Sequence, residues 1–400
     1  MNTPTVVTQA QQNSVKTLAK TAARPVLLLA INNGAAHTRA AEAIAKELGI
    51  QKVAARVVEI SDFMSAVARF THVTAYLWLV KNAPWLWKQI DRYQKKQTHT
   101  SPIWFYRREC QKFFEFVKEI QPSAIVATEV GCGEIAALVK RDLGLKIPLV
   151  AVNLDYEADR AWIQPEIDLY CVASDQVSED FAGFGAEPQK IRVWGVPVEA
   201  DFVIPTDFER AEIRKTLAAK FNFELEKPFV VVAGGGEGIG HIEQLVKRLL
   251  QPDVSSAPQI IVLAGRNQKL KNACEQIARN EKRIRVLAWI DYVPQLYQAA
   301  DLLVSKLGMT FDEALACALP IVALPPPPGA ERVQYELLEK WKVGRAVRTV
   351  DETAEVVNNL LIERNKLSEL RTRAARYSEA NAAGKVAVWL QESVATKTGV

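Results

Sequence analysis

The chain has 400 residues, of which about half are hydrophobic and about a quarter are charged. These are ordinary values for a globular protein, and the length suits two domains. A formal net charge of +4 is small for this length and gives no support to a nucleic-acid partner. The five cysteines are scattered without paired spacing, which argues for a reducing compartment and against a structural zinc site.

Residues 1–23 are polar and lack the apolar core of a signal peptide, so we expect a disordered tail. Residues 24–200 then alternate short apolar runs with helical periods, which is typical of a parallel sheet wrapped by helices. Strands are expected at 25–30, 53–60, 124–128, 148–155, 168–174 and 190–198, with helices at 38–48 and 134–144. No run of about 20 apolar residues is present, so a membrane-spanning helix is not expected.

A charged, proline-marked stretch at 201–228 has a helical period but no buried strand, and we predict a linker there. The alternation resumes over 229–375, and residues 376–400 are predicted as a C-terminal helix with the first domain as a candidate packing surface. The later strands are expected at the start of 229–240 and at 259–265, 283–290, 301–306 and 319–325. We therefore predict an α/β fold with two doubly wound, Rossmann-like domains facing a cleft, where the carboxyl ends of the strands bind ligands.

Two small-residue turns between a strand and a helix are candidate anion sites. GGGEGIG at 234–240 follows an apolar strand, and its glycines would let backbone N–H groups approach a phosphate. A tight turn without a ligand is the alternative, but three successive glycines favour the phosphate. INNGAAH at 31–37 has a similar place in the first domain and ends on His37, which is either a catalytic base or a polar residue at a helix start.

Two later motifs place polar residues on helices. In KLGMTFDEALACALP at 306–320, Glu313 could accept two hydrogen bonds from a ribose diol. The local chemistry alone favours a plainer interpretation, an acid in the first turn of a helix. In PPPPGAERVQY at 325–335, Glu331 and Gln334 lie one helical turn apart and could bind sugar hydroxyls, or they could simply begin a solvated helix.

The stretch from residue 76 to residue 112 mixes aromatic and basic side chains. It contains four of the nine tryptophans, Trp78, Trp85, Trp87 and Trp104. This combination is typical of an interfacial membrane surface. Stacking on single-stranded nucleic acid and partial burial in the core are the alternatives.

Together, and in their order along the chain, these motifs resemble the glycolipid-forming glycosyltransferases that include monogalactosyldiacylglycerol synthase and the processive diacylglycerol glucosyltransferases. A more distant likeness is to the N-acetylglucosaminyl transferase of peptidoglycan synthesis. The landmarks are the His37 loop, YLWLVKNAPWLW, DLYCVAS, GVPV, GGGEGIG, AGRNQKL, the Glu313 helix and Glu331 with Gln334. The resemblance implies a GT-B architecture and a UDP-linked sugar donor held mainly by the second domain.

The resemblance also implies a role for each group of residues. The donor diphosphate would be held by Gly34, Gly235, Gly236, Glu237 and Gly238. The nucleoside would be held by Arg266, Trp289, Ile290 and Glu313, and the sugar by Met309, Thr310, Glu331 and Gln334. An anionic membrane surface on the cytoplasmic side and the lipid acceptor would be contacted by Trp78, Trp85, Trp87, Lys88 and Arg92.

We therefore expect an inverting hexosyltransferase that moves glucose or galactose from a UDP-sugar to a lipid such as diacylglycerol, with His37 as the base. The chain has no Asp-x-Asp clamp, so we expect no metal and no other cofactor, and helix dipoles would stabilise the leaving diphosphate. Another acceptor remains an alternative. So does a nucleotide-sugar-binding protein without catalysis, because Ala35 and Ala36 stand where the family is richer in glycine and Asp159 where many relatives carry histidine.

Overall fold

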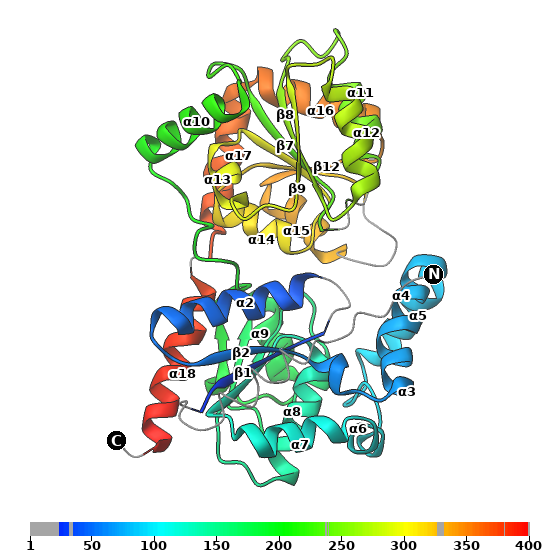
Figure 1. The fold of residues 1–400 in the computed structure, drawn as a ribbon, viewed down its shortest axis with the longest axis vertical. Helices are drawn as coiled ribbons and strands as arrows, with labels where there is room; N and C mark the ends of the chain where they lie inside the picture. The colour runs from blue at the N-terminus through cyan, green and yellow to red at the C-terminus, as the bar shows by residue number, and fades with distance from the viewer. Residues whose placement is uncertain are drawn as a thin grey trace, which may run out of the picture.

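The computed structural model describes residues 24–31, 35–236, 238, 240–325, 332–379 and 381–398, so the tail predicted at 1–23 lies outside the described residues. The described chain forms two α/β units, each built on a six-stranded parallel sheet. Figure 1 shows one unit above the other, with the C-terminal helix running back along the lower one. The two doubly wound domains predicted from the alternation are confirmed.

The first sheet has the strand order β2-β1-β3-β4-β5-β6. Its strands are β1 (Val26–Ala30), β2 (Ala55–Glu59), β3 (Ala124–Ala127), β4 (Leu149–Val152), β5 (Leu169–Val172) and β6 (Ile191–Val193). Successive side chains of a strand point to opposite faces, so both faces must be covered. Leu27 and Leu29 pack on one side against helices within residues 111–142, whereas Val26 and Leu28 pack on the other against the helix at 35–50 and the C-terminal helix.

The helices of the first unit fall into two groups. Those that cover the sheet are α2 (Ala35–Ile50), α7 (Gln111–Ile120), α8 (Val130–Asp142), α9 (Asp175–Gly183) and α18 (Ala382–Thr398), with short turns η4 (Arg160–Trp162) and η5 (Pro188–Lys190). Those that extend beyond it are η2 (Ile60–Phe63), α3 (Ala66–Arg69), the π-helical turn η3 (Phe70–Ala75), α4 (Tyr76–Asn82), α5 (Pro84–Gln94) and α6 (Ile103–Glu109). We call residues 76–109 of this second group the aromatic arm.

The second sheet has the order β12-β11-β10-β7-β8-β9. Its strands are β7 (Phe229–Ala233), β8 (Gln259–Gly265), β9 (Ile284–Ala288), β10 (Leu302–Ser305), β11 (Ile321–Ala323) and β12 (Gly344–Ala346). Its helices are α11 (Ile242–Leu249), α12 (Gln268–Ala278), α13 (Val293–Ala299), α14 (Met309–Ala316), α15 (Arg332–Trp341), α16 (Val350–Ile362) and α17 (Arg364–Arg376). The edge strand β12 was not predicted, because its three residues include a glycine and an arginine.

The chain passes between the two units twice, and both passages contribute to packing. Residues 201–228, predicted as a linker, carry α10 (Asp207–Phe221), whose Leu217 and Phe221 are buried in the core of the second unit. The helix α10 is therefore an element of that unit. After α17 the chain returns, and Val386 and Leu390 of α18 are buried against α2 of the first unit.

Candidate active site

Two turns, one from each unit, meet between the sheets. A Cβ added to Gly236 would lie 4.0 Å from the Cβ of Ala35 at the start of α2, and 3.6 Å from the ring of Trp289. The residue after β8 holds the glycine loop in place, since the backbone N–H of Arg266 donates to the carbonyl of Gly236 at 2.9 Å. The small-residue turns predicted to line a cleft therefore face each other.

Glycine is required at three positions in and beside this loop. Gly235 has a φ of +68°, which L side chains rarely adopt. Gly265 lies so close to the loop that a Cβ there would meet the carbonyl oxygen of Gly236 at 2.5 Å. Gly238 is also left-handed, with a φ of +59°. Gly34 and Glu237, also predicted to hold the diphosphate, lie outside the described residues.

The side chain of His37 is oriented by the strand next to its own. His37 lies in the first turn of α2, and its Nδ1 is 2.6 Å from the carbonyl oxygen of Thr128. A carbonyl oxygen only accepts, so Nδ1 must carry the hydrogen and donate it. In the neutral ring the other nitrogen, Nε2, then holds the lone pair and can take up a proton. The Thr128 hydroxyl donates back to the His37 carbonyl at 3.0 Å and ties the helix start to β3.

Asp155 lies near His37, at the end of the β4 strand. Its side chain can be reached by solvent, but the surrounding protein limits its hydration and raises the pKa of its carboxyl. The charge of Lys95, and that of His37 when the imidazole is protonated, lowers this pKa. Lys95 lies 3.1 Å from Asp91 and also binds Glu157. The part of the cleft next to His37 is thus lined by charged side chains of the first unit.

Glu313, predicted to bind the ribose, is fully buried in α14 and paired across the cleft. Its carboxylate lies 2.6 Å from Nη2 of Arg39, which belongs to α2 of the first unit. Burial raises the pKa of Glu313 to about 7, although the positive charge of Arg39 lowers it. The guanidinium of Arg39 therefore lies against the carboxylate that was predicted to bind a ribose.

The neighbouring Asp312 makes a second contact between the units. The hydroxyl of Tyr156 donates to its Oδ1 at 2.8 Å, while its Oδ2 is buried without a hydrogen-bond partner. Burial raises the pKa of Asp312 to about 8. A carboxyl with such a pKa carries a proton near neutral pH, and the proton makes the buried Oδ2 easier to accommodate.

The residues predicted to bind the sugar lie around the start of α14. The side-chain Oε1 of Gln334 accepts a hydrogen bond from the Gly308 N–H at 2.9 Å and so fixes the turn before α14. Met309 is partly buried against the core of the first unit, and Thr310 is partly buried in the first helical turn. Glu331 lies outside the described residues.

The residues predicted to bind the nucleoside form an aromatic surface beside the glycine loop. The guanidinium of Arg266 lies over the ring of Trp289, 4.6 Å from its centroid. Trp289 is still about half exposed, whereas Ile290 is partly buried against the second core. An exposed ring and a cation next to an anion loop could hold a base.

The tryptophans of the aromatic arm are mostly exposed. Trp78, Trp85 and Trp104 each leave more than half of their surface to solvent, and Lys88 and Arg92 are exposed beside them. Trp87 is half-buried and packs edge-on against Tyr76. Of these four tryptophans only Trp87 is partly buried, so the alternative of burial in the core fails for the other three. No helix among the described residues combines the length and apolar character needed to cross a bilayer.

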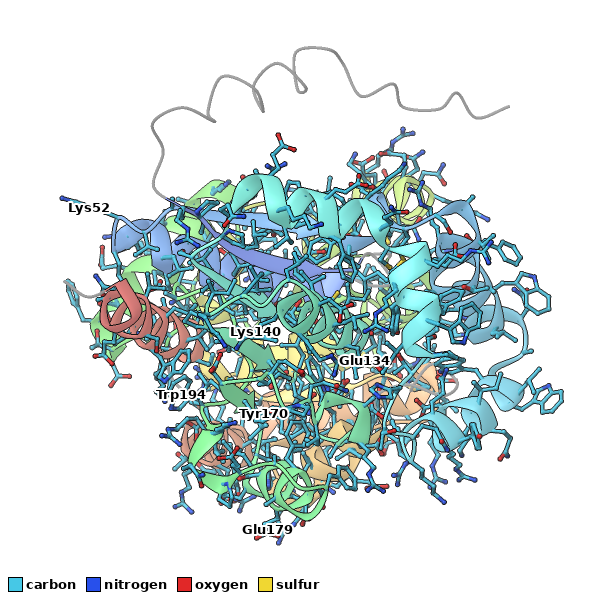
Figure 2. All side chains as sticks on the ribbon, turned by 90° about the horizontal axis from the view of Figure 1, so that it is seen from below. Lys52, Glu134, Lys140, Tyr170, Glu179 and Trp194 are labelled. Atoms are coloured by element: carbon cyan, nitrogen blue, oxygen red, sulfur yellow. The ribbon has the colours of Figure 1, made fainter. Side chains whose placement is uncertain are left out.

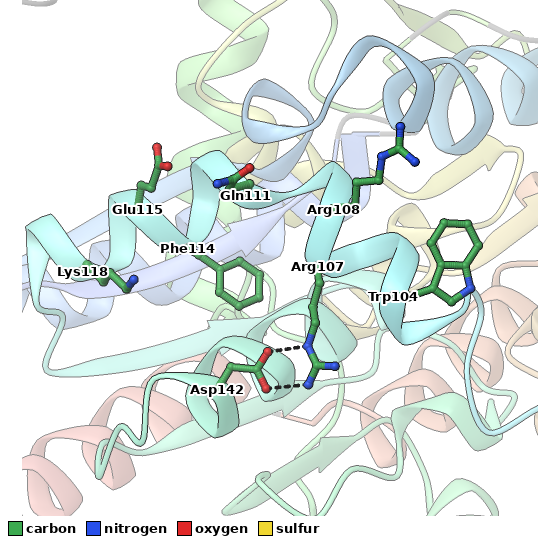
Figure 3. A pocket seen from close by; sticks show the side chains of 8 residues that line it. All are labelled: Trp104, Arg107, Arg108, Gln111, Phe114, Glu115, Lys118 and Asp142. Carbon is green, nitrogen blue, oxygen red and sulfur yellow. Dashed lines mark hydrogen bonds and ion pairs between the residues drawn. The ribbon is translucent and has the colours of Figure 1, made fainter.

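A shallow groove continues this surface beyond Trp104. Its lining residues are Trp104, Arg107, Arg108, Gln111, Phe114, Glu115, Lys118 and Asp142. Figure 3 shows the Arg107 guanidinium beside Asp142, to which it donates two hydrogen bonds, of 2.7 and 2.9 Å. Arg108 and Lys118 are exposed at its edge, so the surface next to the arm is aromatic and basic.

A buried carboxyl anchors the base of the arm. Glu134 of α8 lies in the interior of the first unit, well away from Lys52 and Glu179 at its rim (Figure 2). It accepts hydrogen bonds from the Thr100 N–H, at 3.0 and 3.1 Å, and is 3.1 Å from Nδ1 of His99. These contacts hold the turn that leads into α6.

Sequence reasoning missed several residues of this site. Arg39 and Tyr156 lie where the two units meet, and Lys306 lies beside the glycine loop. Arg39 and Tyr156 belong to no motif with a recognisable spacing, and Lys306 begins the 306–320 motif but was assigned no role in it. Arg39 follows His37 by two residues, and its place in the first turns of a cleft-facing helix is the one local signal it offers. The contacts of all three are made by folding, so spacing along the chain does not reveal them.

Comparisons with known proteins agree with this architecture. Residues 37–198 match the family model described as monogalactosyldiacylglycerol (MGDG) synthase, and residues 230–363 match that of glycosyl transferases group 1. The chain is 25% identical over 360 residues to the processive diacylglycerol beta-glucosyltransferase of Bacillus licheniformis, covering 86% of this chain and 89% of that protein. The corresponding Bacillus subtilis protein is 23% identical over 354 residues, with 86% and 89% covered.

Solved structures share the fold at low identity. Acinetobacter baumannii MurG superimposes with a TM-score of 0.56 at 15% identity, covering 92% of this chain and 99% of that one. The glycosyltransferase SnogD from Streptomyces nogalater gives a TM-score of 0.58 at 15% identity, with 93% and 100% covered. The predicted GT-B architecture is confirmed.

Proposed function

We infer that this chain, a GT-B glycosyltransferase of the monogalactosyldiacylglycerol synthase and processive diacylglycerol glucosyltransferase family, transfers glucose or galactose from a UDP-sugar to a membrane lipid such as diacylglycerol. One observation carries the proposal most directly. His37 donates its Nδ1 hydrogen to the carbonyl oxygen of Thr128 and lies in the helix turn that faces the glycine loop of the second unit. A general base and an anion-binding loop thus meet in one cleft.

The donor would lie along the second unit. Its diphosphate would rest on Gly235 and Gly236, its base near Trp289, and its ribose against Glu313. The last of these contacts requires Arg39 to move, because Arg39 now pairs with that carboxylate. The sugar would then be held near the start of α14, where Gln334 fixes the turn.

The chemistry follows from the positions of these groups. An acceptor hydroxyl is a poor nucleophile, and Nε2 of His37 would remove its proton as the oxygen attacks the anomeric carbon. The attack comes from the face opposite the leaving diphosphate, so the anomeric centre is inverted. Backbone N–H groups of the glycine loop and the start of α2 would stabilise the charge on the diphosphate, and we propose that no divalent metal is needed.

The acceptor would reach the cleft from a membrane surface. The exposed tryptophans of the aromatic arm suit the interface of a bilayer, and Lys88 and Arg92 suit anionic headgroups. We therefore propose that the protein binds peripherally to the cytoplasmic face of a membrane, with the arm as its contact.

The decisive experiment supplies pure protein with radiolabelled UDP-glucose or UDP-galactose and vesicles containing diacylglycerol. We expect labelled lipid from one of the donors, with or without EDTA. An absence of labelled lipid with both donors would contradict the proposed acceptor. UDP binding without any turnover over a broad acceptor panel would instead indicate a nucleotide-sugar-binding protein.

A further inference from the structure

Lys306 reaches the glycine loop from the neighbouring strand. It directly follows β10, which pairs with β7, the strand that leads into the loop. Its Cε lies 3.1 Å and its Nζ 4.0 Å from the position that a Cβ of Gly235 would occupy. The half-buried lysine therefore runs over the backbone of the loop, and its ammonium group lies beside the proposed diphosphate site.

The missing side chain of Gly235 makes this approach possible. Any Cβ at position 235 would crowd the end of the Lys306 chain, and it would also be strained at a φ of +68°. The ammonium donates to the carbonyl oxygen of Leu307 at 3.3 Å, which holds it next to the turn before α14. Loop and lysine thus form one structural feature, in which backbone N–H groups and a cation are next to each other.

The proposed reaction needs positive charge at this point. When the bond between the anomeric carbon and the diphosphate oxygen breaks, its electron pair stays on the phosphate and adds a negative charge there. Arg39 lies beside Glu313 and Arg266 lies over Trp289, whereas the end of the Lys306 side chain lies directly beside Gly235 of the loop. A lysine is a compact cation that suits phosphate oxygens of changing geometry.

We propose that Lys306 binds the diphosphate of the donor and stabilises the charge that develops on the leaving nucleoside diphosphate. This inference rests on the proposed function. The acceptor hydroxyl gives its proton to Nε2 of His37, its oxygen bonds to the anomeric carbon, and the nucleoside diphosphate leaves with the electron pair. Lys306 takes part as a charge and gives up no proton.

The test compares how UDP and uridine bind to Lys306→Met, because uridine lacks the diphosphate. In titration calorimetry or ligand-observed NMR, we expect UDP to bind at least about tenfold more weakly to the variant than to the wild type. Uridine should bind equally to both. Lys306→Arg keeps the charge and should restore most of the UDP affinity. Lys215→Met, a change at an exposed lysine of α10, serves as the matched control.

Two results would overturn the proposal. Equal losses of UDP and uridine affinity would mean that Lys306 only shapes the turn before α14. An unchanged UDP affinity would mean that the ammonium does not contact the diphosphate. The measurement needs no acceptor, so it is separate from the test of the proposed function. If no lipid product forms but UDP binding depends on Lys306, the acceptor is wrong and the role of the lysine stands.

Discussion

The carbonyl of Thr128 decides which nitrogen of His37 can act as a base. Because Nδ1 must donate to this oxygen, Nε2 of the neutral ring has the lone pair that the proposed reaction requires. The same strand end holds the helix start through the Thr128 hydroxyl, so the ring cannot drift far from the cleft. The proposed role of His37 thus depends on a residue 91 positions away in the chain.

We predict that His37→Ala lowers turnover by about 10²- to 10⁴-fold, the usual contribution of a general base, and leaves UDP affinity nearly unchanged. His37→Asn is the matched variant, since its amide can still donate to Thr128 but cannot take up a proton. Initial rates and UDP calorimetry on both variants check this. Activity retained in His37→Asn would remove the histidine from the base role.

Glu134 leads to a prediction about pH and stability. Burial raises its pKa from an unfolded value of 4.5 to about 8. The folded protein therefore binds more protons than the unfolded chain between these values, and this carboxyl makes folding less favourable as the pH rises through the window. Glu134→Gln removes that contribution. Thermal unfolding at pH 5 and pH 8 tests this. We expect the unfolding temperature of the variant, relative to that of the wild type, to be higher at pH 8 than at pH 5. Parallel pH dependence would contradict the assignment.

The elements that line the cleft are short and depend on their surroundings. α14 has only eight residues, and two adjacent ones, Asp312 and Glu313, turn their carboxyl groups toward the first unit. A helix of this length has little stability alone. Its buried contacts and the Gln334 hydrogen bond to Gly308 hold it in place.

The aromatic arm gives a prediction for membrane binding. Trp85→Ala should weaken binding to anionic phosphatidylglycerol vesicles by about fivefold, or about 1 kcal/mol, because a largely exposed indole no longer enters the interface. Phe208→Ala removes an equally exposed ring from α10, far along the chain from the arm, and should bind as the wild type does. Vesicle sedimentation measures both. Equal losses in the two variants would mean that the arm is not the contact surface.

Polar contacts hold the two units in the arrangement of Figure 1. Arg39 pairs with Glu313, Tyr156 donates to Asp312, and Arg332 lies 3.0 Å from Glu157. The first two involve buried carboxyl groups, so they are sensitive to what enters the cleft. If the donor ribose binds Glu313 as proposed, donor binding and the relative position of the units would be coupled at α14.

We predict that Arg39→Gln tightens UDP binding by about tenfold, because the ribose would no longer compete with a guanidinium for Glu313. Arg332→Gln is the control, since it breaks an exposed ion pair between the units and leaves Glu313 alone. Calorimetry with UDP distinguishes the two. Weaker binding in Arg39→Gln would mean that Arg39 itself contacts the nucleotide.

Most strands and the division into two sheets could be predicted, since buried parallel strands are continuous apolar runs such as VLLLA and FVVVA. Two features could not. β12 has the sequence GRA and is a strand because β11 offers it an edge. The stretch around α10 looks like a charged linker, yet Leu217 and Phe221 are buried in the second core. Because this charged helix has so few apolar residues, its hydrophobic periodicity is weak.

Periodicity and motif order along the chain were enough to predict the fold class, the resemblance to glycolipid-forming glycosyltransferases, and His37 and the glycine loop as candidates. These properties depend on residues near one another in sequence, where spacing is informative. Only the tertiary structure showed that Arg39 forms an ion pair with Glu313, that Thr128 orients His37, and that Lys306 lies over Gly235. Each of these contacts joins segments brought together by two sheets and the packing between them, and charge interactions across such a cleft have no local signature.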